Sequence, residues 1–124
     1  MTDPHDPAAV VQRQLDAYNA RDVAALLATY APDARQYAHP GTLLASGAAE
    51  IGARMAVRFG EPNLHARLLQ RVVMGNIVID HELVTRTFAD GPGTVDMVAI
   101  YEVCDGKISS ACVQARNEQR FPPA

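Results

Sequence analysis

Apolar residues recur with helical spacing in the first half of the chain. Val11, Leu15 and Tyr18 lie at positions i, i+4 and i+7 and follow an Asp-Pro pair that is typical of a helix start. This pattern predicts a helix over about 7–20, and Asp22 is expected to cap a short second helix. Both helices are therefore expected to bury one face against a common core.

A third helix is predicted to begin after Ser46. Ile51, Met55 and Phe59 share one helical face, and Gly60 is typical of a helix end. The three predicted helices precede most of the β-type sequence in the chain.

The pattern then changes to one that favours strands. Four runs of β-favouring residues extend from Leu64 to Asn117, and an earlier strand is expected over 34–39. The runs are separated by Gly75-Asn76, by the segment ADGPG and by Asp105-Gly106, which are hairpin-type connections. The predicted order is helix, helix, strand, helix and four long strands.

The strand over 94–104 carries apolar residues on both faces. One face holds Val95, Met97, Ala99, Tyr101 and Val103, while the other holds Val98, Ile100 and Cys104 with Asp96 and Glu102. An antiparallel sheet with one face in water normally alternates cleanly, so the second apolar set needs its own cover. Because exposed apolar patches of this kind mark interfaces, we expect a homodimer through the outer face of the sheet.

The strand over 76–88 is equally ambiguous. Its alternation groups His81 with Ile77, Ile79 and Leu83, and groups Asp80 and Glu82 with Val78 and Val84. We assign the acidic pair to the outer face, where Arg67, Arg71 or Arg86 can neutralise it, and His81 to the cavity side. Successive side chains point to opposite faces, so the Asp-His-Glu triplet is not expected to bind a metal. A single β-bulge would exchange these faces.

Composition argues against several classes of function and of site. The chain has 124 residues, is 48% hydrophobic and carries a formal net charge of −3, with its 11 basic residues scattered, so nucleic-acid binding is not expected. No apolar run is long enough to span a membrane, and the acidic start is unlike a signal peptide, which favours a cytoplasmic protein. Cys104 and Cys112 lack metal-type spacing and are expected to be reduced, buried thiols.

The features that carry a family resemblance are the order of the elements, the Ser-Gly pair before the third helix, and the segments AYNARDVAALLATYAPDA and AIYEVCDGKISSA. In these features the chain resembles the nuclear-transport-factor-2-like superfamily, in its SnoaL-like and ketosteroid-isomerase-like branch. The resemblance extends from about Val10 to Arg116. It implies an α+β cone with three N-terminal helices packed on a strongly curved, mainly antiparallel mixed sheet, in the order ααβαββββ. It also implies a homodimer with a ligand cavity on the concave face. We expect one domain over 1–124, with a core of about 8–117.

The catalytic residues of ketosteroid isomerases do not carry over. Their proton-abstracting aspartate precedes a proline near the end of the first strand, and this position falls on Ala38 or His39. Their oxyanion-binding tyrosine and aspartic acid fall near Gln14 and Ala99. The resemblance therefore does not imply a standard ketosteroid isomerase.

Other residues can supply acid-base chemistry. A histidine suits general acid-base chemistry at neutral pH, and Tyr37 shares the strand face of His39, so the two are candidate catalytic residues; alternatively, His39 only occupies an exposed strand corner at the cavity rim. His81 is a second candidate proton carrier. The candidate ligand-binding residues are Gln14, Tyr18, Met55, Phe59, Met97, Ala99 and Tyr101. Tyr18 and Tyr101 are alternatively core aromatics, and Gln14 a solvated boundary residue.

Three functions remain open at this point. The first is an enzyme without cofactor or metal that catalyses proton transfer, isomerisation, cyclisation or hydration of a small, apolar, oxygenated molecule. The second is a ligand-binding module without catalysis, and the third is a dimerisation module. The resemblance fits all three, because members of one fold family differ widely in chemistry.

Overall fold

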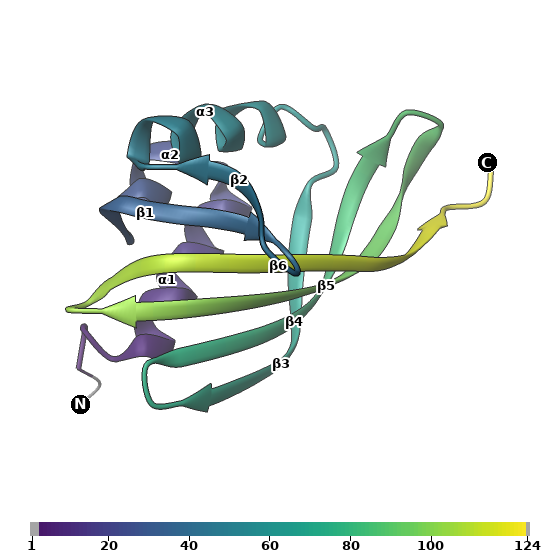
Figure 1. Cartoon of the computed structure of the whole chain (residues 1–124). Helices are drawn as coiled ribbons and strands as arrows, with labels where there is room; N and C mark the ends of the chain where they lie inside the picture. The colour runs from purple at the N-terminus through teal and green to yellow at the C-terminus, as the bar shows by residue number, and fades with distance from the viewer. Residues whose placement is uncertain (1–2, 124) are drawn as a thin grey trace.

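The computed structural model describes residues 3–123 as two layers, with helices packed on one side of a curved sheet (Figure 1). The helices are α1 (Pro7–Ala20), α2 (Val23–Leu27) and α3 (Ala48–Arg58). The strands are β1 (Tyr30–Ala38), β2 (Thr42–Ser46), β3 (His65–Met74), β4 (Ile77–Phe88), β5 (Gly91–Cys104) and β6 (Lys107–Arg120). Their order in the sheet is β2-β1-β6-β5-β4-β3, with β1 and β6 parallel and the other neighbours antiparallel.

This arrangement confirms the predicted α+β cone and adds one strand. β2 pairs with β1 after the turn at 39–41, in a segment that the sequence analysis left without structure. Most of β2 is exposed, so its residues lack the alternation that makes a half-buried strand recognisable.

The helix starts follow the predicted capping residues. The Asp6 carboxylate accepts a hydrogen bond from the backbone N–H of Ala9, and the Asp22 carboxylate accepts one from that of Ala25. α3 begins one residue later than predicted, because Gly47 is its cap with a positive φ of 86°.

The core lies between the helices and the concave face of the sheet. Val10, Leu26, Ile51, Val78 and Ile108 are among its fully buried residues and come from both layers. The inner residues of β5 also lie here, as predicted from their alternation. No helix of the described residues is both long and apolar enough to cross a bilayer.

The faces assigned to β4 are reversed in the structure. Asp80 lies opposite Ala99 and Glu82 lies opposite Met97, so both carboxyl groups belong to the buried inner face. His81 lies opposite Val98 on the outer face instead. The prediction was wrong because both faces of β4 are partly apolar, and only pairing with β5 decides which one turns inward.

A bulge in β3 completes this arrangement. The register shifts between Leu68 and Gln70, so Leu69 has no partner on β4, and Arg71 lies opposite Asp80. Without the extra residue, Arg71 would point outward. The bulge thus brings a cation to the buried carboxylates.

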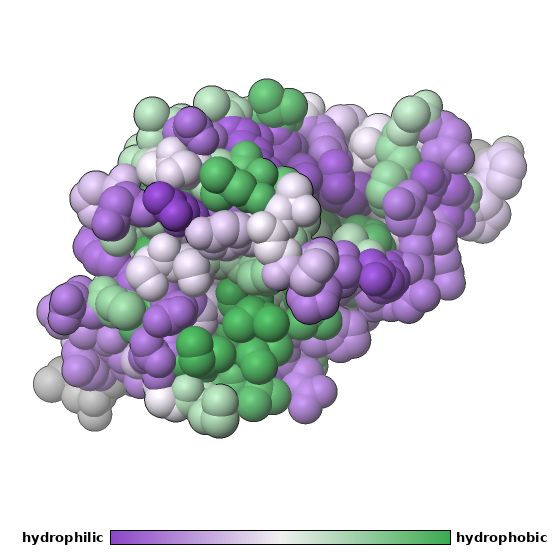
Figure 2. Space-filling view, in the orientation of Figure 1, coloured by the Kyte–Doolittle hydropathy of each residue, from purple (hydrophilic) through white to green (hydrophobic). Residues whose placement is uncertain are grey.

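The outer face leaves part of its apolar surface in solvent. Val98 and Ile100 are 39% and 38% exposed, and Figure 2 shows a hydrophobic area over β4 and β5. Cys104 is also exposed on this side, contrary to the expected burial, because it occupies the end of β5 with outward parity. Both cysteines are free.

Candidate functional site

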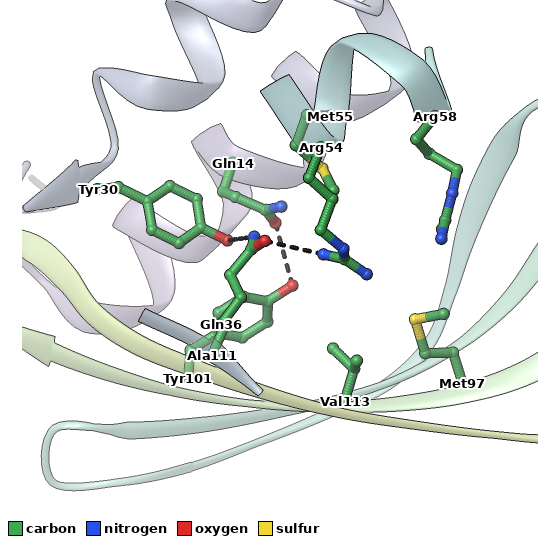
Figure 3. Close-up of a pocket in the computed structure, with 10 residues that line it drawn as sticks. All are labelled: Gln14, Tyr30, Gln36, Arg54, Met55, Arg58, Met97, Tyr101, Ala111 and Val113. Carbon is green, nitrogen blue, oxygen red and sulfur yellow. Dashed lines mark hydrogen bonds between the residues drawn. The ribbon is translucent and has the colours of Figure 1, made fainter. Parts of the chain in front are cut away.

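A small cavity lies between α1, α3 and the concave face of the sheet (Figure 3). Its volume is about 50 Å³, enough for a few water molecules. The lining residues are Gln14, Tyr30, Gln36, Arg54, Met55, Arg58, Met97, Tyr101, Ala111 and Val113. A second cavity of about 20 Å³ shares Gln14, Met97 and Tyr101 with the first and also contacts Glu82. We call the two together the inner cavity.

Hydrogen bonds fix the polar side chains of the inner cavity. The Tyr101 hydroxyl donates to Gln14 Oε1 at 3.2 Å. Gln36 Nε2 donates to the Tyr30 hydroxyl at 3.2 Å, and Arg54 Nη1 donates to Gln36 Oε1 at 2.8 Å (Figure 3). Residues from α1, α3, β1 and β5 are thereby oriented toward one space.

Both tyrosines of this network are neutral hydrogen-bond donors at physiological pH. Burial raises the pKa of Tyr30 to about 12, although the hydrogen bond with Gln36 opposes the shift. Burial also raises the pKa of Tyr101 well above its usual value. Neither phenol is therefore suited to act as a base, whereas each can donate a hydrogen bond to a ligand oxygen.

Glu82 is the group in the inner cavity that titrates near neutral pH. Its side chain faces the smaller cavity, and the residue is 5% exposed. Burial raises its pKa to about 7; Asp80 adds to this shift, and Arg71 opposes it. A carboxyl group with this pKa can accept and return a proton at physiological pH.

Asp80 is held quite differently from Glu82. Arg71 Nε contacts Asp80 Oδ1 at 2.7 Å, and Arg71 Nη2 contacts Asp80 Oδ2 at 2.9 Å. Arg71 Nη1 also donates to Gln12 Oε1 at 2.9 Å. Among residues 3–123, by contrast, no hydrogen bond or ion pair to the Glu82 carboxyl is present. Glu82 is therefore free to interact with a ligand.

Two arginines of α3 place positive charge at the inner cavity. Arg54 points toward Gln36 and Tyr101, and Arg58 lies one helical turn further along (Figure 3). Burial, and then the charge of Arg58, lower the pKa of Arg54 from its usual value, but a guanidinium remains charged at any physiological pH. The cavity thus has cations on its α3 side and a carboxyl group on its β4 side.

The structure places most predicted ligand-binding residues around the inner cavity. Gln14, Met55, Met97 and Tyr101 line its larger part, and Tyr18 lines its smaller part. Phe59 and Ala99 are buried in the core instead, and Phe59 packs edge-on against Tyr18 with ring centroids 5.5 Å apart. A role of these residues in binding stays a prediction.

The three predicted catalytic residues lie outside the inner cavity. Tyr37 is paired with Cys112 on β6, opposite in parity to the buried Gln36, and His39 lines an apolar groove of about 240 Å³ on the outer face. His81 Nε2 lies 3.3 Å from Asp96 Oδ1, also on the outer face. The expected cavity-side position of His81 was wrong, because the parity of β4 is set by its pairing with β5. A catalytic role of Tyr37 and His39 at the inner cavity is not supported by their positions.

Sequence reasoning missed Glu82, Gln36 and Arg54. For Glu82, the pattern was ambiguous: Val78 and Val84 share its parity, but Ile77, Ile79 and Leu83 make the other parity of β4 equally apolar. For Gln36, the small residues Ala34 and Ala38 give no signal of an inward face either. Among residues 3–123, no group of three or more His, Cys, Asp or Glu side chains is placed to hold a metal.

Comparisons with known proteins agree with this architecture. A family model described as a SnoaL-like domain matches residues 11–111. A search of curated proteins finds no match. Among solved structures, an uncharacterized cystatin fold protein from Novosphingobium aromaticivorans is similar, with 26% identity, coverage of 94% of this chain and 100% of that chain, and a TM-score of 0.74.

Two further similar structures carry functional names. A putative SnoaL-like polyketide cyclase from a Jannaschia species has 20% identity and a TM-score of 0.76, with 88% of this chain and 84% of that chain covered. An LEH-like epoxide hydrolase from M. tuberculosis has 14% identity and a TM-score of 0.77, with 89% and 82% covered. At these identities the likeness shows the shared fold alone.

Proposed function

This chain belongs to the SnoaL-like domain family, and from that premise we propose that it catalyses proton transfer on a small, apolar, oxygenated molecule bound in the inner cavity. The reaction is an isomerisation, cyclisation or hydration that needs no cofactor. The names of the similar cyclase and epoxide hydrolase support this class of reaction. The family alone does not decide the chemistry, so the proposal depends on the residues of the cavity.

One observation carries the proposal: Glu82 is buried at the inner cavity with a pKa raised to about 7. A general base is most effective when its pKa is near the working pH, because it is then both available and strong enough. In the proposed reaction, the ionised Glu82 removes a proton from a carbon of the substrate. The carboxylic acid then returns the proton to another atom of the product.

Removal of that proton leaves negative charge on a substrate oxygen. The Tyr101 hydroxyl supports stabilisation of this charge, because it is a buried donor that lines both parts of the inner cavity. Tyr101 would exchange its hydrogen bond with Gln14 for one to the substrate. Gln14 would then accept a bond from another group of the ligand.

The volume of the inner cavity limits the substrate or requires motion. Typical ligand sites have volumes of about 300–1,000 Å³, several times more than the empty space here. Met55 and Met97 are flexible lining residues that can change conformation to admit a ligand. The mismatch at the ketosteroid isomerase positions favours a second candidate function, a ligand-binding module without catalysis.

The decisive experiment is exchange of the α-protons of cyclopentanone in deuterated buffer, followed by proton NMR. This ketone is small, apolar and oxygenated, and its α-protons exchange when a base removes them. The protein is expected to accelerate exchange over buffer, with a rate that rises with pH through about 7, the pKa of Glu82.

Glu82→Gln should abolish the acceleration. Glu102→Gln is a matched control, because Glu102 is an exposed carboxylate on neighbouring β5. Equal exchange with the wild type and Glu82→Gln would contradict the proposal. Binding of cyclopentanone without exchange would favour the ligand-binding module.

We also propose that the protein forms a homodimer through the outer face of its sheet. The apolar groove at Val98, Ile100 and Cys112 and the hydrophobic area in Figure 2 support this interface. Val78 and Val84, which the sequence analysis placed on the same face, are buried in the core and are not part of it.

A further inference from the structure

We propose that the α3 side of the inner cavity is an anion-binding site, which makes the substrate class a small apolar carboxylate. Arg54 binds the carboxylate group, and Arg58 adds positive charge beside it. This inference rests on the proposed function, since it assigns one end of the same substrate.

The first observation is that Arg54 is under-used as a donor. Its guanidinium has five N–H groups, and one of them donates to Gln36 Oε1 at 2.8 Å. No ion pair within residues 3–123 includes Arg54. A partly buried cation normally has a carboxylate partner, because removing it from water is costly. The free N–H groups face the cavity (Figure 3), where a ligand can supply that partner.

The second observation is an excess of cations around this end of the cavity. Arg58 is 3.6 Å from the Glu61 carboxylate, but Arg86 holds the same carboxylate with contacts of 2.8 and 2.6 Å. Glu61 therefore neutralises mainly Arg86 and only partly Arg58, while Arg54 has no ion-pair partner within residues 3–123. The mutual repulsion of Arg54 and Arg58 contributes to the lowered pKa of Arg54. An anion bound between them would relieve it.

The third observation is the polarity of the cavity as a whole. Arg54 belongs to the larger part, Glu82 belongs to the smaller part, and Tyr101 lines both. A carboxylate bound by Arg54 would direct the apolar part of the ligand toward Met97 and Glu82. The anion is thus held away from the ionised base, while a carbon of the ligand is presented to it.

Methyl-labelled methionine NMR can test this site directly. Met55 and Met97 line the cavity, whereas Met74 is exposed at the end of β3 and serves as an internal reference. The probes are butyrate and its neutral isostere butyramide, titrated at about pH 6, where Glu82 with its pKa of about 7 is mainly protonated. Butyrate is expected to shift the Met55 and Met97 signals and to bind about tenfold more tightly than butyramide.

Two variants locate the charge that is responsible. Arg54→Gln should remove the preference for butyrate, while Arg35→Gln should keep it, because Arg35 is exposed on β1 next to Gln36 with opposite parity. Arg58→Gln should reduce the preference in part, and thermal melting establishes that each variant is folded. Two results with the wild type alone would overturn the proposed anion-binding site: equal affinities for butyrate and butyramide, or no shift of the Met55 and Met97 signals with butyrate.

This test is independent of catalysis. Glu82→Gln should retain the preference for butyrate over butyramide. If the wild type prefers butyrate but does not accelerate the exchange of cyclopentanone, the proposed function alone is rejected. Conversely, exchange of cyclopentanone that needs Glu82, combined with equal binding of butyrate and butyramide, would reject the anion site alone.

Discussion

Arg71 on β3 holds Asp80 on β4 through two parallel contacts of 2.7 and 2.9 Å, and Asp80 is fully buried. Removal of the cation would leave Asp80 as an uncompensated buried charge. We therefore expect Arg71→Met to lower the free energy of unfolding by about 3–5 kcal/mol, as measured by urea denaturation. Arg67→Met is the control, because Arg67 is exposed on the same strand. Equal losses in the two variants would contradict a special role for the pair.

Glu82 should make stability depend on pH. Its pKa is about 7 in the folded protein against 4.5 for the free group, so the folded state binds the proton more tightly. The stabilisation is complete below pH 4.5 and is lost as pH rises through about 7. From pH 4.5 to 7 this loss is roughly 3 kcal/mol.

Glu82→Gln removes this contribution, because the amide does not titrate. The variant should therefore gain roughly 3 kcal/mol in stability relative to the wild type between pH 5 and pH 8, since the wild type loses that amount. Urea denaturation of both proteins at the two pH values measures the difference. A constant difference between the two proteins would show that Glu82 ionises normally.

Tyr101→Phe should affect both the fold and the cavity chemistry. It removes the hydroxyl that donates to Gln14 Oε1 and leaves this acceptor without its protein partner, at a cost of about 1 kcal/mol in unfolding free energy. It should also slow cyclopentanone exchange, which tests the proposed oxyanion contact. Tyr37→Phe, outside the inner cavity, should change neither property. An unchanged exchange rate in Tyr101→Phe would remove the hydroxyl from the mechanism.

His39→Ala distinguishes the site expected from sequence from the one in the structure. His39 lies on the outer face of the sheet, and it is not one of the residues within 3–123 that line the inner cavity. We therefore expect this variant to exchange cyclopentanone at the wild-type rate. A strong loss of exchange with an unchanged melting temperature would return His39 to the mechanism.

The proposed dimer can be tested with a charge on the outer face. Val98→Lys places a cation in the apolar groove and should raise the dimer Kd by about tenfold or more, as measured by light scattering across a concentration series. Val57→Lys is the control, because Val57 is 80% exposed on α3. A monomeric wild type at high concentration would exclude this interface.

Local patterns in the sequence determined most of the secondary structure. The capping residues Asp6 and Asp22 place the starts of α1 and α2, because a carboxylate next to free backbone N–H groups acts within one turn of the chain. The alternation of β5 similarly predicts its inner face. In β5 one parity is apolar throughout, so no partner strand is needed to decide which side is buried.

Only the tertiary structure decided the position of the candidate site. Both parities of β4 carry apolar residues, so the burial of Glu82 rather than His81 depends on the register with β5. The bulge at Leu69 then turns Arg71 toward Asp80, and α3 brings Arg54 within 2.8 Å of Gln36. These contacts join residues far apart in the chain. Their geometry follows from strand pairing and layer packing, which no local pattern of side chains encodes.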